Sequence, residues 1–239
     1  MKPDLRPRRL LTAAILLVSA ARPALAQVGH DPARSPYRTL RYGQFVGITG
    51  GHFGGGGGQI GVAPHKGETF GLRYDFLAAN TVTMGLSVTH MRLERFIVNK
   101  DKPIETGKTG PVDVNGTFFE GIFQLNITGG KTWHGIGPFA SAGFGVALID
   151  RTAADSSGFK FRVKAALTPG IGARVFLSDR LFLRLEARTT FWQVSYPQVY
   201  RSPPSSDLTK PPVITGSSKE WVTNTWYTVG LSYAFHRPF

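Results

Sequence analysis

The chain has 239 residues and a formal net charge of +13 at pH 7, and it contains no cysteine. The absence of cysteine excludes disulfides, thiol catalysis and cysteine-based metal sites. The bases are scattered without a basic helix or tract, which argues against nucleic acid as the partner. After residue 26, no stretch has the ~18 consecutive apolar residues that a membrane-spanning helix needs, so any membrane crossing must use strands.

The first 26 residues have the three parts of a cleaved secretory signal peptide. Basic residues at positions 2, 6, 8 and 9 precede an apolar stretch from Leu10 to Ala21, and Ala24-Leu25-Ala26 forms a small-residue cleavage site. An uncleaved anchor is the alternative. We expect export with cleavage after Ala26, followed by a lead-in over residues 27–40 whose role the sequence does not indicate.

Eight strand-like runs separated by turn signals follow, and they predict one domain over residues 41–239. Within these runs apolar and polar side chains alternate, as in a wall between lipid and a polar lumen. Long and short connectors also alternate, from the two-residue Ser178-Asp179 to the long Pro197–Glu220. The predicted fold is an all-β, eight-stranded antiparallel transmembrane up-and-down β-barrel. Its predicted strands are Arg41–Gly51, Glu68–Ala78, Thr81–Val98, Thr117–Thr128, Gly135–Asp150, Lys160–Leu177, Arg180–Tyr196 and Trp221–Phe235.

The last strand carries the most specific motif. Its outer positions are apolar, and Thr228, Gly230, Tyr233 and Phe235 match the spacing of the C-terminal β-signal that it resembles, found in bacterial outer-membrane proteins. The resemblance implies recognition by the barrel-assembly machinery. The usual signal ends on its last aromatic residue, whereas four residues follow Phe235 here, so the sequence leaves open whether Phe235 or Phe239 is recognised.

Two further segments, Gly137–Gly145 and Leu177–Glu186, resemble the fifth strand and the sixth-to-seventh hairpin of small OmpA-like outer-membrane barrels. The resemblance implies an outer-membrane location, and we expect a monomer by default and no cofactor. The resemblance gives little indication of activity, because that superfamily includes adhesins, membrane organisers, transport barrels and lipid-modifying enzymes. The basic charge favours outer-membrane lipid headgroups and lipopolysaccharide as partners.

An eight-stranded barrel is just wide enough for side chains to fill its interior, so inward polar groups should plug it. Buried charges must pair, which predicts a structural ion network. A gated channel for ions or small solutes is the alternative. The candidate lumen residues are Arg73, Asp75, Glu120, Lys164, Arg174, Arg184, Glu186 and Arg188.

Catalysis would need a nucleophile and a base on the same face. His90 and Glu94 share a face of one strand, but Ser87 lies on the opposite face, which disfavours a lipid A acyl-modifying enzyme. A soluble lipocalin-like barrel, with an apolar lumen and a polar exterior, is the remaining alternative. We therefore expect a non-enzymatic structural or surface-binding membrane protein.

Two sets of exposed residues are also expected. Basic loop residues would face outward and could contact a polyanion; they are Lys100, Lys102, Lys108, Arg201, Lys210 and Lys219. Aromatic residues near strand ends would suit the girdles that flank a membrane. They are Trp133, Tyr196, Trp221, Trp226, Tyr227 and Phe239.

Overall fold

The computed structural model describes residues 35–99, 101–102, 104–151, 155, 157–204 and 208–235. The expected signal peptide, residues 27–34 of the lead-in, Lys100 and Phe239 lie outside this part of the chain.

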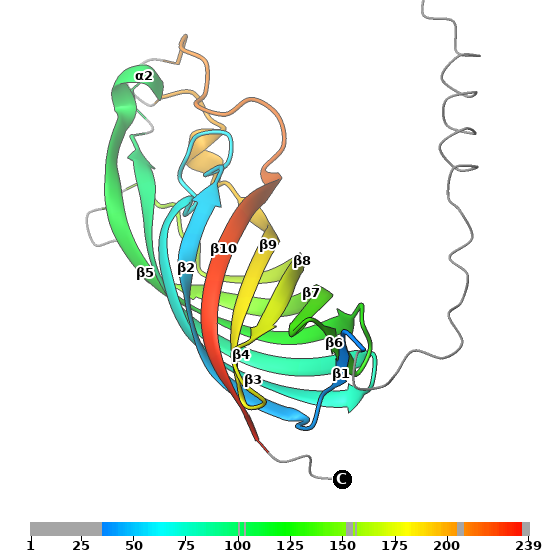
Figure 1. The fold of residues 1–239 in the computed structure, drawn as a ribbon. Helices are drawn as coiled ribbons and strands as arrows, with labels where there is room; N and C mark the ends of the chain where they lie inside the picture. Colours follow the sequence, from blue (N-terminus) through cyan, green and yellow to red (C-terminus); the bar gives the residue numbers. More distant parts are fainter. Residues whose placement is uncertain are drawn as a thin grey trace, which may run out of the picture. The chain divides into compact units, whose positions relative to one another are not determined.

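Eight long strands form a closed barrel, and the predicted eight-stranded antiparallel β-barrel is confirmed. Each strand pairs antiparallel with its neighbours around the barrel. The last strand pairs with the first barrel strand, from Asn224 opposite Gly55 to Phe235 opposite Gln44, and this closes the barrel (Figure 1). The strands are β2 (Gln44–Gly55), β3 (Lys66–Ala79), β4 (Val82–Val98), β5 (Lys108–Asn126), β7 (Ile136–Ile149), β8 (Val163–Phe176), β9 (Leu181–Ser195) and β10 (Lys219–Phe235).

Two strands extend four or more residues beyond a predicted end. β2 continues through the glycine run to Gly55, because Gly51 and Gly55 still find partners on β10. β5 begins at Lys108 instead of Thr117, since it stays paired with β4 up to the contact of Val98 with Lys108. Cross-strand hydrogen bonding therefore extends both strands beyond the segment in which their own side chains alternate clearly.

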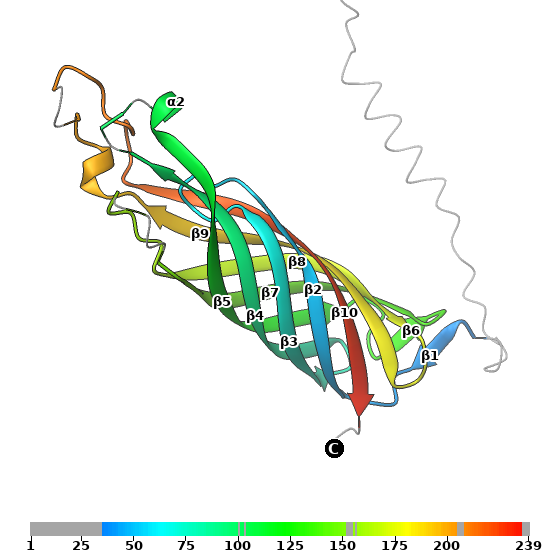
Figure 2. The same cartoon turned by 90° about the vertical axis from the view of Figure 1, so that its left-hand side faces the viewer.

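The connectors place long loops at one end and tight turns at the other. In the β8–β9 turn the Ser178 hydroxyl accepts hydrogen bonds from the backbone N–H groups of Arg180 (3.3 Å) and Leu181 (3.1 Å), which fixes a short reversal. The short helix α2 (Ile104–Gly107) and the β9–β10 connector with its 3₁₀ turn η2 (Gln198–Tyr200) lie together at the long-loop end (Figure 2). No helix among the described residues is long and apolar enough to cross a membrane.

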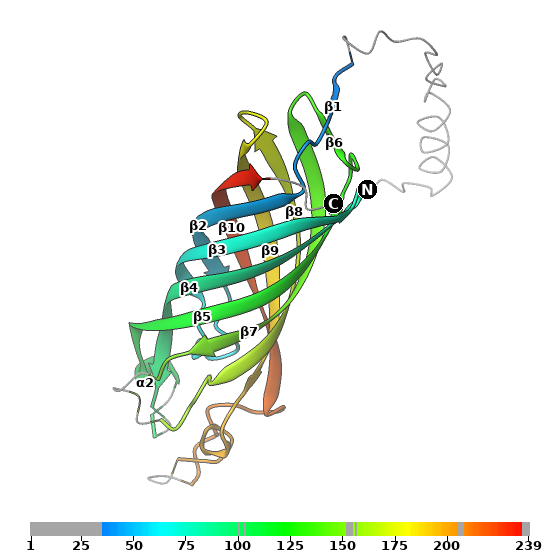
Figure 3. The same cartoon turned by 90° about the horizontal axis from the view of Figure 1, so that it is seen from below.

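A small two-stranded addition lies at the tight-turn end. β1 (Tyr37–Thr39), part of the predicted lead-in, pairs antiparallel with β6 (Lys131–Trp133) in the β5–β7 connector (Figure 3). The Leu40 N–H also donates to the Gly130 carbonyl at 2.9 Å. No sequence signal had suggested this pairing, because each partner is only three residues long.

The outer wall of the barrel is apolar. Side chains alternate between the two faces of each strand, and the outward positions are large and exposed, such as Leu72 (63%), Leu86 (64%) and Ile171 (67%). Inward positions at the same level hold buried charged groups such as Arg73 and Asp75. This arrangement is the reverse of a lipocalin-like barrel with a polar exterior.

Candidate functional site

A layer of paired charges occupies the middle of the barrel interior. Arg73 donates through Nε to Asp75 Oδ1 at 2.9 Å and through Nη1 to Glu186 Oε2 at 3.1 Å. Arg184 Nη2 donates to the other oxygen of Asp75 at 2.8 Å. These four residues come from β3 and β9 and are all buried. We refer to them, together with Glu120, Arg174 and Arg188, as the ionic layer.

Glu120 on β5 anchors the second part of the ionic layer. It accepts hydrogen bonds from Arg188 on β9, from Ser87 on β4 at 3.3 Å and from Thr168 on β8. Glu120 therefore links β5 to β4, β8 and β9. Because β8 and β9 are not neighbours of β5 in the sheet, this single carboxylate connects distant strands across the interior. Ser141 on β7 likewise donates to Glu186 at 3.0 Å.

Two side-chain amides extend the layer, and sequence reasoning had not singled them out as members. Gln124 Oε1 accepts from Arg184 Nη1 at 2.8 Å, and Asn126 Oδ1 accepts from Arg174 Nη2 at 2.5 Å. The Gln124 amide nitrogen donates to Asn126 Oδ1 at 2.7 Å. Gln124 and Asn126 lie two and four residues after Ile122 on β5, so their side chains share its inward face. This alternation was the available signal.

Of the eight candidate lumen residues, the structure places seven in the ionic layer and leaves Lys164 apart. Lys164 is half-buried near the long-loop end of β8, where its ammonium group lies 5.9 Å from the centre of the Phe161 ring. It shares the inward parity of Arg174 on the same strand. The two residues lie near opposite ends of β8, so Lys164 does not reach the ionic layer.

Apolar clusters border the ionic layer on both sides, as the inward residues of β9 show in order. Phe182 belongs to a small cluster with Phe45 and Ala234 at the tight-turn end. Arg184, Glu186 and Arg188 follow in the ionic layer, and Trp192 and Val194 then enter a large apolar cluster. The large cluster fills the long-loop half of the interior, where the sequence had indicated polar side chains.

Loop residues cap the large cluster. Ile60 and Val62 come from the β2–β3 loop, Phe159 from the β7–β8 loop, and Tyr200 and Ile214 from the β9–β10 loop. All five side chains are buried. The three longest described loops therefore fold over the barrel mouth and contribute to its core.

Two aromatic residues expected in a membrane girdle lie instead inside the barrel. Trp226 is fully buried between Phe53 and Phe118, with the Arg188 guanidinium 4.8 Å from its ring centre. Tyr196 is 5% exposed and joins the same cluster. For Trp226 the girdle prediction is wrong because the residue shares the inward parity of Thr228. Trp133, Trp221 and Tyr227 do face outward.

Hydrogen bonds hold the loops in place above the large cluster. Arg95 Nη2 pairs with Asp155 Oδ2 at 2.5 Å, and Tyr200 Oη donates to the Val98 carbonyl at 3.2 Å. Burial alone would raise the pKa of Asp155, but hydrogen bonds from Ser157 and Arg95 outweigh it and lower the pKa below its usual range. The Asp155 carboxylate is therefore stabilised in its charged form.

A second contact joins the start of the β9–β10 loop, β10 and the β2–β3 loop. The Tyr196 hydroxyl donates to Glu220 Oε2 at 2.5 Å, and the Gln59 N–H donates to the same oxygen at 2.9 Å. Burial and the neighbouring Glu220 carboxylate both raise the pKa of Tyr196. The phenol thus stays protonated and serves as a hydrogen-bond donor at neutral pH.

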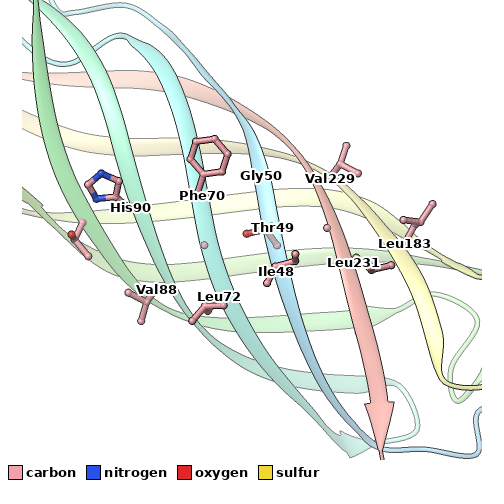
Figure 4. Close-up of a pocket in the computed structure, with 13 residues that line it drawn as sticks. Ile48, Thr49, Gly50, Phe70, Leu72, Val88, His90, Leu183, Val229 and Leu231 are labelled. Carbon is pink, nitrogen blue, oxygen red and sulfur yellow. The ribbon is translucent and has the colours of Figure 1, made fainter.

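The residues considered for catalysis lie on opposite sides of the barrel wall. His90 faces outward and borders an apolar hollow of about 750 Å³ with Phe70, Val88 and Ile48 (Figure 4). Ser87 points inward and donates to Glu120. The wall therefore separates the imidazole from this hydroxyl, as their opposite parity had indicated.

Solved structures with a similar fold are bacterial outer-membrane proteins. The outer membrane protein OprG from Pseudomonas aeruginosa is 16% identical, with a TM-score of 0.50 over 83% of this chain and 99% of that chain. Neisserial surface protein A is 11% identical, with a TM-score of 0.52 over 80% and 97% of the two chains. The outer membrane enzyme PagL also matches, at 13% identity over 80% of this chain and 99% of that chain, with a TM-score of 0.38. No family model and no curated protein matches this chain. At these identities the likeness concerns the fold, which is that of outer-membrane eight-stranded barrels.

Proposed function

We propose that this chain is an integral outer-membrane protein with a closed, non-conducting barrel whose long loops bind the anionic part of lipopolysaccharide. The apolar outer wall supports a lipid environment, because such a surface would be unfavourable in water. The filled interior supports a structural or surface-binding role over a small-solute channel. Since short turns face the periplasm in barrels of this type, the long loops would face outward.

The observation that carries the binding role is an excess of exposed bases at the long-loop end. Exposed acidic side chains at this end, among the residues whose side-chain exposure the structure describes, are Glu68, Asp113 and Asp150. The exposed basic side chains there are more numerous: Lys66, Arg92, Lys102, Lys108, Arg151, Lys160, Arg162, Arg201, Lys210 and Lys219. This positively charged face would attract the phosphate groups of a surface polymer.

Binding of deacylated, phosphorylated lipopolysaccharide oligosaccharide tests this role, because without acyl chains the oligosaccharide cannot bind through the apolar wall. Changing Lys102, Lys160 and Arg201 to Gln removes three exposed loop charges. At about 1 kcal/mol for each base near an anionic surface, the affinity should fall by about two orders of magnitude at low salt. Calorimetric titration of the detergent-solubilised protein gives the dissociation constants.

A matched control changes Arg38, Arg41 and Lys131 to Gln, which removes three exposed charges from the tight-turn end. This variant should bind like the unchanged protein, and dephosphorylated oligosaccharide should bind weakly to all three proteins. Equal loss of affinity in both variants would indicate a response to net charge alone, and unchanged affinity in the loop variant would refute the binding role.

The same proposal includes export with cleavage after Ala26, membership of the OmpA-like barrels and insertion by the barrel-assembly machinery through β10. In β10, Thr228 lies inside the barrel and Tyr233 outside, while Phe235 is the last described residue. Gel mobility of outer-membrane fractions with and without boiling tests location and barrel closure together. Recovery in the soluble periplasmic fraction, without a heat-dependent shift, would contradict the membrane assignment.

A further inference from the structure

Arg174 is a buried guanidinium that pairs with no carboxylate of the described residues. It is 1% exposed, and its one hydrogen bond runs from Nη2 to the neutral Asn126 amide oxygen at 2.5 Å. Within the part of the chain that the structure describes, its Nε and Nη1 atoms have no hydrogen-bond partner. A buried charge that is neither paired nor fully hydrogen-bonded is strongly unfavourable, so a compensating negative charge would stabilise this part of the ionic layer.

A second arginine adds to the positive charge near Arg174. Arg184 lies directly opposite Arg174 in the β8–β9 register. Its two terminal nitrogens donate to Gln124 and Asp75 at 2.8 Å each, but its Nε finds no acceptor among the described residues. Like charges at directly opposed positions repel each other. The ionic layer as a whole has four arginines and three carboxylates, which are Asp75, Glu120 and Glu186.

The strand on the other side of β8 leaves space beside Arg174. Gly137 on β7 is the register partner of Arg174. A Cβ atom at Gly137 would lie 3.9 Å from Arg174 Nε and 3.9 Å from Thr132 Cγ2, with no closer contact. Apart from residues 136–138, no atom therefore lies closer than 3.9 Å to this point beside the unpaired Nε–H, which leaves room for a small anion between Arg174 and the Gly137 backbone.

Aromatic and apolar side chains surround this part of the ionic layer. The Phe45 ring lies 5.4 Å from the Arg174 guanidinium and the Phe139 ring 4.9 Å from that of Arg184. Phe45, Phe182 and Ala234 close the tight-turn end of the interior. Charge interactions are stronger where apolar side chains replace water.

We propose that the barrel interior binds a small monovalent inorganic anion, of halide size, beside Arg174 Nε in the space left by Gly137 and close to Arg184. The anion balances the excess positive charge of the ionic layer and accepts N–H groups that have no protein acceptor. This site is independent of the proposed polyanion binding, because it lies inside the barrel at a distance from the loops.

Bromide provides a direct probe, since it scatters anomalously and replaces chloride. Crystals of the full-length mature protein grown in bromide should show an anomalous peak within hydrogen-bonding distance of Arg174 Nε. In urea titrations at constant ionic strength, replacing gluconate by bromide should raise the unfolding midpoint of the unchanged protein, because a ligand that binds only the folded state stabilises it.

Two variants separate charge from space. Arg174→Gln removes the unpaired charge, and Gly137→Val fills the gap but keeps both arginines; each should abolish the bromide-dependent shift. Lys164→Gln, which removes an inward base outside the ionic layer, should keep the shift. If Arg174→Gln fails to fold, the Gly137→Val comparison and the anomalous peak still decide. A water molecule at the site in bromide crystals, or equal shifts in all the proteins, would overturn the proposal.

Discussion

At the scale of single residues, Glu120 connects more of the barrel than its sequence context suggests. It is buried and accepts hydrogen bonds from Arg188, Ser87 and Thr168. Glu120→Gln keeps the size of the side chain but leaves Arg188 without its carboxylate. We expect the free energy of unfolding to fall by about 3–5 kcal/mol, as when one partner of a buried ion pair is removed. Urea-induced unfolding in detergent micelles measures this change.

An exposed ion pair provides the control for that experiment. Arg41 and Asp179 lie 2.9 Å apart at the tight-turn end, with side chains that are 74% and 61% exposed. Solvent screens such pairs, so Asp179→Asn should cost about 0–1 kcal/mol. Comparable losses for Glu120→Gln and Asp179→Asn would contradict the importance of burial in the ionic layer.

At the scale of elements, the β7–β8 loop depends on the charge of Asp155. Its pKa is lowered in the folded protein, so the contacts with Arg95 and Ser157 stabilise the docked loop fully above the unfolded-state pKa of about 3.9. This contribution is lost as the pH falls through the lower, folded-state value. We expect the loop to be docked at neutral pH and to loosen in acid.

Hydrogen exchange of residues 157–161, corrected for the intrinsic effect of pH, measures this docking. Asp155→Asn should exchange faster than the unchanged protein at neutral pH, and the difference should shrink as the pH falls below about 4. Asp113→Asn, which removes an exposed carboxylate from β5, should have no effect. A difference that stays constant down to pH 2 would show that the charge of Asp155 does not hold the loop.

At the scale of the whole molecule, the order of layers inside the barrel determines permeability. A large apolar cluster, the ionic layer and a smaller apolar cluster follow one another along the interior. Because the two apolar clusters exclude water, we expect no steady current through the folded protein in a planar bilayer. A porin in the same bilayer is the positive control, and the heat-dependent gel shift confirms that the test protein is folded. A reproducible steady conductance would refute the closed interior.

Much of this protein follows from local sequence patterns. In strands such as β3 and β9, apolar and polar residues alternate, which predicts the side chains on the outer and inner faces. The alternation of long and short connectors predicts the even strand number. Arg73, Glu120 and Arg184 each occupy inward-facing positions of their strands. Because an eight-stranded barrel has a single narrow interior, the sequence also predicts that these residues share it. These features depend on neighbours along the chain, so the sequence by itself determines them.

The tertiary structure alone decides which inward residues meet. Strand register brings Glu120 to Arg188 and places Arg174 opposite Arg184, whereas Lys164 stays apart although its parity is the same. Loop folding brings Tyr200 and Ile214 into the core, and it makes the long-loop half of the interior apolar. Parity fixes the face of a side chain but not its height in the barrel, and contacts between distant strands depend on that height.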